Sequence, residues 1–226
     1  MKSNAQRINL CRKNSVRALT RVEVLAIVVI VTLFLLSVLL PWFNDARSRA
    51  RSICCNCNLK GIGLSFKMWA GDHNDKYPMQ VSATGTNGGA MEFVYRGILF
   101  PVFQVMSNEL NTPKVVNCPA DSQRFPATNF TTAFSNTNIS YFVGLDADET
   151  QAAMFLAGDR NITNGAPARK GILELTTNEI AGWTGEIHRR NGNILLTDGS
   201  VQQATGSRLN YLLQNSGVAT NRLLMP

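Results

Sequence analysis

The sequence predicts an α+β protein, in which a long N-terminal helix with a membrane-spanning first half packs on an antiparallel β-sheet. Three observations predict this fold class. Val24–Leu40 is an uncharged run of seventeen residues, which at 1.5 Å per residue gives a helix of roughly 25 Å, enough for a short membrane span. Apolar residues then recur at helical spacing as far as Trp69. Beyond Met91 the pattern changes to short β-branched and aromatic runs separated by turn residues.

The basic charge of the chain lies mainly ahead of the apolar run. Within the net charge of +7, six basic residues and no acid fall in residues 1–21: Lys2, Arg7, Arg12, Lys13, Arg17 and Arg21. From Pro41 onward, 16 basic and 14 acidic side chains nearly balance. A basic flank predicts a single pass through the lipid bilayer with the N-terminus in the cytoplasm. The balanced remainder argues against a nucleic-acid partner, and we expect none.

The residues after the apolar run are expected to continue the helix. Pro41 kinks a helix without ending it, and the next strong breaker is the turn cluster Gly71–Asp75. The spacing therefore predicts one helix of about fifty residues with an amphipathic second half. Its predicted buried stripe comprises Phe43, Ala46, Ala50, Ile53, Cys57, Leu59, Ile62, Phe66 and Trp69.

The rest of the chain predicts strands and one short closing helix, at Ser207–Asn215. Ser122–Asn138, rich in Thr, Asn and Ser, is interpreted as a long ordered loop. The runs that predict strands are Glu92–Tyr95, Ile98–Val105, Lys114–Asn117, Ile139–Gly144, Ile172–Thr176 and Ile180–Trp183.

Two dipeptides, Asn191-Gly192 and Asp198-Gly199, belong to the types most favoured in two-residue hairpin turns. If both turns are tight, three strands pair in a fixed register. One cross-strand row then faces the core and contains Ile187, Leu196 and Val201. The row on the opposite face contains His188, Leu195 and Gln202.

The cysteines agree with the predicted topology. Cys11 lies on the cytoplasmic side, whereas Cys54, Cys55, Cys57 and Cys118 lie beyond the span, where disulfides persist. Cys55-x-Cys57 has no second Cys/His pair at metal-ligand spacing, so a zinc site is disfavoured. We expect instead a disulfide from one cysteine of the 54–57 cluster to Cys118.

The segment ahead of the apolar run carries a recognisable processing pattern. A basic leader ends in the small residue Ala18, and Glu23 follows as the fifth residue after it. This pattern resembles the cleavage site of type IV prepilins and type II secretion pseudopilins. The resemblance implies cleavage between Ala18 and Leu19, methylation of Leu19, and a role for Glu23 in pairing with the N-terminal amine of a neighbouring subunit. Arg21 stands where that family has an apolar residue.

Later stretches extend the resemblance to pilin-like proteins of planctomycete- and verrucomicrobia-type bacteria. They are Asn58–Leu64, Trp69–Pro78, Val116–Asp121, Ile139–Gly144 and the His-x9-Asp-Gly spacing from His188 to Asp198 and Gly199. The resemblance implies a pilin-like fold and a disulfide between Cys55 and Cys118. It assigns no role to the His-x9-Asp-Gly motif.

A catalytic or metal-binding function is not expected. On the predicted register Asp198 lies opposite residue 185, roughly 10 Å along the strand from His188, which exceeds hydrogen-bond reach. Two oxygen-rich stretches, Asp72–Asp75 and Asp146–Glu149, admit a calcium ion but lack the EF-hand ligand pattern and are interpreted as turns. We therefore expect no catalytic residues, no metal and no cofactor.

Two hypotheses for function follow. The first is a structural subunit of a bacterial periplasmic pseudopilus, with other pseudopilins, a prepilin peptidase and an inner-membrane assembly platform as partners. It divides the chain into a leader (1–18), a transmembrane segment (19–40), an amphipathic continuation (41–73) and a periplasmic domain (74–226). The second is a monomeric tethered module that binds glycan, in which Trp69, Tyr141 and Trp183 supply stacking surfaces.

Overall fold

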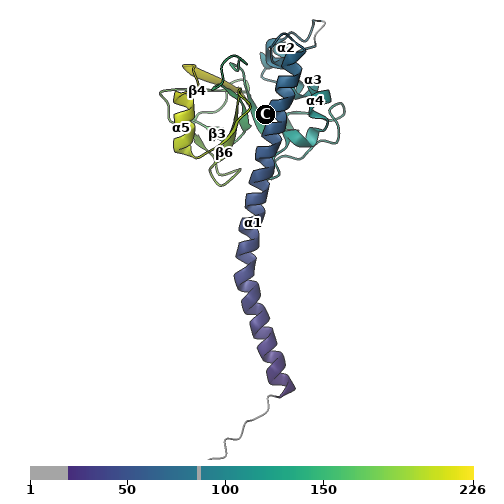
Figure 1. The fold of residues 1–226 in the computed structure, drawn as a ribbon, viewed down its shortest axis with the longest axis vertical. Coiled ribbons are helices and arrows are strands. Elements are labelled where there is room, and N and C mark those ends of the chain that lie inside the picture. The colour runs from purple at the N-terminus through teal and green to yellow at the C-terminus, as the bar shows by residue number, and fades with distance from the viewer. Residues whose placement is uncertain (1–19, 86–87) are drawn as a thin grey trace, which may run out of the picture. The chain divides into compact units, whose positions relative to one another are not determined.

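The computed structural model describes residues 20–85 and 88–226, and for residues 40–45 it describes the helical backbone alone. The chain divides into two compact units, Met1–Asp45 and Ala46–Pro226. A single helix, α1 (Arg21–Gly71, 51 residues), contributes to both units, as Figure 1 shows, and confirms the predicted long helix. The predicted combination of an apolar N-terminal helix and an antiparallel sheet is also confirmed.

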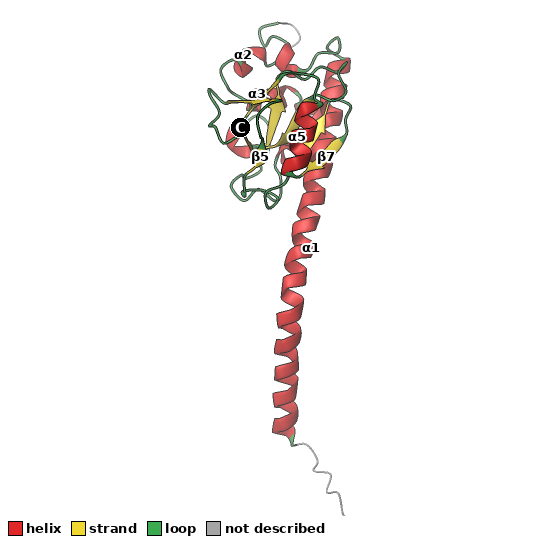
Figure 2. Cartoon of the chain, turned by 90° about the vertical axis from the view of Figure 1, so that its left-hand side faces the viewer, coloured by secondary structure: helices red, strands yellow, loops and turns green. Residues whose placement is uncertain are grey.

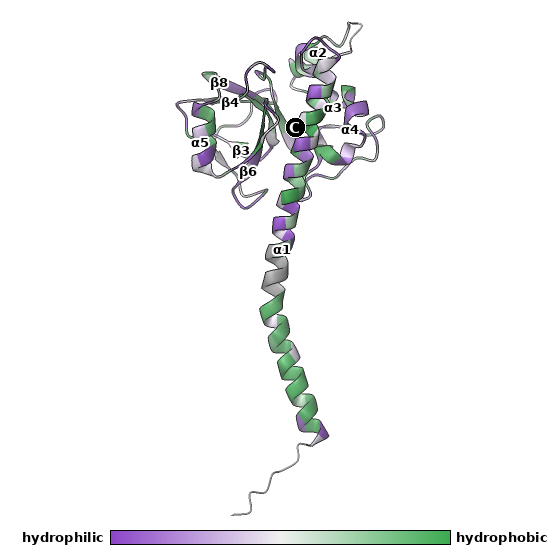
Figure 3. Ribbon diagram, in the orientation of Figure 1, coloured by the Kyte–Doolittle hydropathy of each residue, from purple (hydrophilic) through white to green (hydrophobic). Residues whose placement is uncertain are grey.

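In the first unit α1 is apolar on every side. Arg21–Leu39 has a mean hydropathy of 2.9 and is long and apolar enough to cross a membrane, and Figure 3 shows it coloured hydrophobic almost throughout. A helix that is apolar all round and not covered by protein is stable in lipid rather than in water. The hydroxyls of Thr32 and Ser37 donate to helix carbonyls three or four residues back, which satisfies them without water.

In the second unit the C-terminal part of α1 lies between a sheet and a group of short helices (Figures 1 and 2). The short helices precede the sheet in the chain; they are η1 (Pro78–Gln80), α2 (Met91–Val94), α3 (Phe100–Val105), α4 (Ser107–Leu110), η2 (Pro113–Val116) and η3 (Asn136–Asn138). The predicted closing helix is present as α5 (Gly206–Gln214), with Leu209, Leu212 and Leu213 buried.

The main sheet has six strands in the order β4-β8-β1-β2-β6-β7, and every neighbouring pair is antiparallel. Its strands are β1 (Tyr141–Gly144), β2 (Phe155–Asp159), β4 (Ile172–Thr176), β6 (Gly192–Leu196), β7 (Val201–Ala204) and β8 (Thr220–Leu224). A separate ladder pairs β3 (Ile162–Thr163) with β5 (Gly182–Trp183). The sequence predicted β4 correctly, and its predicted strands Ile139–Gly144 and Ile180–Trp183 contain β1 and β5, but it missed β2, β3 and β8.

Three of the predicted strands are wrong, because they are short helices. Glu92–Tyr95 falls in α2, Ile98–Val105 in α3 and Lys114–Asn117 in η2. Both α3 and η2 carry a proline in the first turn, where the missing N–H costs nothing. Besides Pro101, the buried residues around α3 are Leu99, Val102, Phe103 and Met106, a helical spacing that the apolar run concealed.

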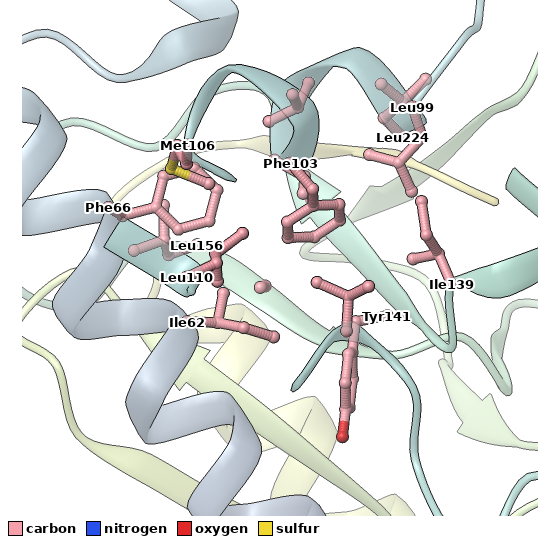
Figure 4. Packing of buried hydrophobic residues seen from close by; sticks show 14 of the residues in the cluster. Ile62, Phe66, Leu99, Phe103, Met106, Leu110, Ile139, Tyr141, Leu156 and Leu224 are labelled. Atoms are coloured by element: carbon pink, nitrogen blue, oxygen red, sulfur yellow. The ribbon is translucent and has the colours of Figure 1, made fainter. Parts of the chain in front are cut away.

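One core cluster of the second unit forms between α1, the short helices and the sheet, and another forms between the sheet and α5. In Figure 4, Ile62 and Phe66 of α1 face Phe103 and Met106, with Leu156 of the sheet beside them. The rings of Phe66 and Phe103 meet edge to face at 6.3 Å between centroids.

The predicted buried stripe on α1 is correct only in its second half. The part that is buried comprises Leu59, Ile62, Phe66 and Trp69, and it begins at Cys55. Ala46, Ala50, Ile53 and Cys57 are exposed instead, and the side chain of Phe43 lies outside the described part. At 100° per residue, Ile53 and Cys57 lie on the face of α1 opposite Cys55 and Ile62. Apolar residues recur at the same helical spacing on both faces of α1, so the spacing alone does not identify the buried face.

The hairpin predicted at Asn191-Gly192 is wrong. The residues before it form a turn, and Gly192 opens β6. The second hairpin exists, but its loop has three residues rather than two: Leu196 pairs with Ser200 around the turn, and Leu195 pairs with Val201. This shift of one residue breaks both predicted cross-strand rows. Leu195 pairs with Val201 rather than with Gln202, and it is fully buried although it was predicted on the face opposite the core.

Candidate functional site

The residues expected to carry assembly chemistry lie at the start of the chain. Ala18 and Leu19 are outside the described residues. Glu23 forms a reciprocal cap with Thr20: its Oε2 accepts from the Thr20 N–H at 2.7 Å, and its own N–H donates to the Thr20 hydroxyl at 3.3 Å. This Thr-x-x-Glu box satisfies donors at the first turn of α1. Glu23 therefore has a role within its own chain, as half of an N-terminal cap, in addition to the one that the resemblance implies.

A disulfide joins Cys55 of α1 to Cys118, which follows η2. It confirms the expected bond from the cysteine cluster to Cys118 and selects Cys55 among the three candidates. Cys54 and Cys57 are exposed free thiols. Because successive helical residues point about 100° apart, Cys55 faces the core while its neighbours face away. The bond ties α1 to the segment that leads into the sheet.

His188 lies in the turn that leads into β6. It and the next two residues have left-handed backbones, with φ of 52°, 53° and 66°, a conformation that costs about 1–2 kcal/mol for each non-glycine residue. The amide of Asn161 holds the turn, because its Nδ2 donates to the carbonyls of Thr184, Ile187 and Asn191. The turn therefore places the imidazole in the interior at a cost that these bonds offset.

The imidazole of His188 reaches both the disulfide and a buried carboxylate. Its Nε2 lies 3.5 Å from Cys118 Sγ and 3.4 Å from Oδ2 of Asp159, the last residue of β2. The same Oδ2 accepts from the N–H and Nδ2 of Asn193, at 2.7 and 2.9 Å. Oδ1 of Asp159 is buried with no hydrogen-bond partner among the described residues. Sequence reasoning did not identify Asp159 or Asn193.

Burial changes the protonation of this cluster. It raises the pKa of Asp159 to about 7, although the two bonds from Asn193 oppose it. It lowers the pKa of His188, while the charge of Asp121 opposes that shift. Both effects disfavour charged forms, as expected where water is excluded.

Asp198 and Gly199 form the turn between β6 and β7. Ser200 and Lys67, not His188, donate hydrogen bonds to Asp198. Asp198 Oδ1 accepts from the N–H of Ser200 at 2.7 Å, and the Asp198 carbonyl accepts from Nζ of Lys67 at 3.0 Å. Gly199 has φ of +87°, which suits the left-handed position of a three-residue hairpin loop. The carboxylate next to His188 is Asp159 instead.

The two ends of the His-x9-Asp-Gly motif therefore fix β6 against α1. At one end His188 contacts the disulfide that starts on Cys55; at the other, Asp198 accepts from Lys67. Between these two ends, Leu195 of β6 packs closely against Gly63 of α1. A Cβ added at Gly63 would lie only 2.8 Å from Leu195 Cδ1, so a larger residue would not fit there without a shift. These contacts give the motif a structural role in positioning the sheet on the helix.

Gly199→Ala is expected to lower the free energy of unfolding by about 1–2 kcal/mol, because a Cβ disfavours the left-handed conformation that this loop requires. Urea denaturation followed by circular dichroism measures the change. Gly185→Ala is the matched control, since no atom lies within 4 Å of its added Cβ. An equal loss in both variants would contradict this account of the turn.

A second buried charged cluster lies near the disulfide. Arg160 donates from Nε to Asp121 Oδ2 at 2.7 Å and from Nη2 to Oδ1 at 2.9 Å. Arg160 also donates to Glu186 and Gln123. The side chain of Asp121 is 1 % exposed, so this two-bond pairing is what makes its burial tolerable.

The remaining candidates from the sequence are carboxylates of an acidic loop and three aromatic side chains. Asp146 pairs with Arg222, and Asp148 accepts from the backbone and hydroxyl of Thr150, which matches a turn. Trp69, Tyr141 and Trp183 are buried and offer no stacking surface. An open hollow of about 480 Å³ does exist beside the exposed Tyr95 and the edge strand β4.

No family model, curated protein or solved structure matches the chain.

Proposed function

We propose that the chain is a membrane-anchored structural subunit of the prepilin type. A prepilin peptidase cuts it between Ala18 and Leu19, and it then joins a periplasmic pseudopilus of the type II secretion kind with other pseudopilins on an inner-membrane platform. The observation that carries the proposal is α1, which begins with Glu23 in its first turn, is apolar on every side through Leu39, and ends inside a helix-and-sheet unit. The predicted topology places that unit in the periplasm.

The outer face of α1 in the second unit supports assembly. It carries Ile53, Cys57, Leu64 and Met68, which are all exposed and follow one another at steps of four and seven. Large apolar side chains aligned in water are typical of a surface that another protein covers. In this proposal the neighbouring subunit's α1 covers it, while the opposite face holds the core.

The carboxylate of Glu23 also fits the proposal. In the free subunit its Oε2 accepts bonds from Thr20, so a charge at the edge of the membrane has partners before assembly. Cleavage after Ala18 leaves Thr20 in the chain, so the cap survives processing. The new N-terminal amine of a neighbour then supplies the cation that a carboxylate in an apolar bundle needs.

The processing step is tested by mass spectrometry of the full chain from membranes of cells that carry or lack a prepilin peptidase. We expect an N-terminus at Leu19, with a methyl group, in the first cells and an intact leader in the second. An intact leader in both, or a cut beyond Leu40, would contradict the proposal.

The glycan-binding alternative has less support. The aromatic residues that suggested it are buried, and Tyr95 is the aromatic side chain that lines the hollow beside β4. One exposed ring among charged neighbours is weak support for sugar stacking.

A further inference from the structure

The environment of the disulfide differs from that of an ordinary structural bond. Cys55 and Cys118 are fully buried, and two polar groups are buried with them, the imidazole of His188 and the carboxylate of Asp159. A disulfide is neutral and makes little use of either group. Burying a carboxylate oxygen without a partner costs free energy, and Asp159 Oδ1 has none among the described residues.

The four side chains are of the kinds that bind zinc. The sulfur atoms of Cys55 and Cys118 and a ring nitrogen of His188 all lie within 4.8 Å of one another. In a tetrahedral zinc site, bonds of 2.3 Å to sulfur and 2.0–2.1 Å to nitrogen put those two ligand atoms about 3.5 Å apart. The observed separation of Cys118 Sγ from His188 Nε2 is 3.5 Å.

The carboxylate of Asp159 lies beside the same ring nitrogen. Zinc bonds of about 2.0–2.1 Å to nitrogen and oxygen put those two atoms about 3.4 Å apart. His188 Nε2 lies 3.4 Å from Asp159 Oδ2. Asn193 already orients this carboxylate through two hydrogen bonds, as outer partners do for metal-binding carboxylates.

We propose that Cys55, Cys118 and His188 bind one Zn²⁺ when the disulfide is reduced, with Asp159, whose Oδ2 lies 3.4 Å from His188 Nε2, as the ligand for the fourth position. A phosphine or dithiol reductant adds two electrons and two protons to the disulfide and yields two thiols. Zinc binding then releases both thiol protons to solvent and leaves two thiolates on the metal. Disulfide and metal are alternative occupants of one buried site.

Sequence spacing conceals this site, since 63 residues separate the two cysteines and 70 separate Cys118 from His188. The inference does not depend on the proposed assembly role, because it concerns only the second unit.

The test uses the full chain in detergent in a background of Cys11→Ser, Cys54→Ser and Cys57→Ser, which leaves the two buried cysteines. After reduction with a phosphine, Co²⁺ is added and its thiolate charge-transfer and ligand-field bands are followed. We expect one Co²⁺ per chain, displaced by one Zn²⁺, and no binding to the oxidised protein.

His188→Asn is the diagnostic variant, because it keeps both cysteines and the disulfide. We expect it to weaken binding by more than about 100-fold and Asp159→Asn by about 10- to 100-fold. Zinc should also raise the melting temperature of the reduced background protein. A reduced background protein that binds neither metal, folded or not, would overturn the proposal, as would equal affinity in the His188→Asn variant.

Discussion

Replacing Arg160 with methionine is expected to lower the free energy of unfolding by about 3–5 kcal/mol. Arg160 forms two parallel hydrogen bonds to Asp121, and the two side chains are 10 % and 1 % exposed. Methionine preserves much of the volume but removes the cation. Asp121 would then keep a buried charge with no opposite charge beside it, which is the costly half of a broken ion pair. Urea denaturation of the full chain in detergent measures the loss.

The chain provides a matched control at its surface. Arg222 also pairs with an aspartate through two nitrogens, although both donate to the same oxygen of Asp146, Oδ1, and the Arg222 side chain is 52 % exposed. Arg222→Met is expected to cost less than about 1 kcal/mol, because water screens an exposed pair. Adding Asp121→Asn to Arg160→Met should recover part of the loss. Equal costs at the two arginines would contradict the role given to burial.

Acid gives an independent measurement of the same pair. Burial raises the pKa of Asp121, but the hydrogen bonds and charge of Arg160, together with the hydrogen bond from Gln123 and the hydroxyl of Ser140, lower it more, so the pKa lies below its ordinary value. A carboxyl with a lowered pKa stabilises the fold above its unfolded pKa, near 3.9, and this stability is lost as the pH falls through the folded pKa. The Arg160→Met variant should lose less stability over that range than the unaltered protein.

Replacing Cys55 and Cys118 together with alanine is expected to lower the free energy of unfolding by about 4 kcal/mol. The two residues are 63 apart in sequence, so the bond removes much freedom from the unfolded chain. The pair is also the covalent link between α1 and the segment leading into the sheet. Urea denaturation without reductant measures the difference.

The other cysteines beyond the apolar run provide the control for this prediction. Cys54 and Cys57 are exposed and unbridged, so Cys54→Ser with Cys57→Ser is expected to change stability by less than about 0.5 kcal/mol. A large loss in that variant, with a small one in the alanine pair, would show that the cysteines pair differently.

The sequence predicted the features that depend on local pattern. The length of α1, the strand β4 and the helix α5 follow from periodicity and turn residues. Predictions failed where an apolar run is too short to show its period, as in α3. They also failed where one extra loop residue, between Leu196 and Ser200, changed the register of a hairpin.

The cluster of His188, Asp159 and the disulfide could not be predicted from a single sequence. The sequence singled out Cys118 and His188 but gave no reason to place them together. Asp159 ends a strand, β2, in which Ala157 and Gly158 weaken the strand pattern, so neither the strand nor its buried acid was expected. Such long-range contacts depend on the order of strands in the sheet, which local patterning does not specify.

The central claim is that processed subunits assemble through α1. It is tested by placing one cysteine in the exposed position Val22, as Val22→Cys, in the background without Cys11, Cys54 and Cys57. A thiol-specific crosslinker is then applied to cells that carry or lack a prepilin peptidase. The account predicts crosslinked oligomers in cells with the peptidase and monomers in cells without it. The same products in both kinds of cell would contradict it.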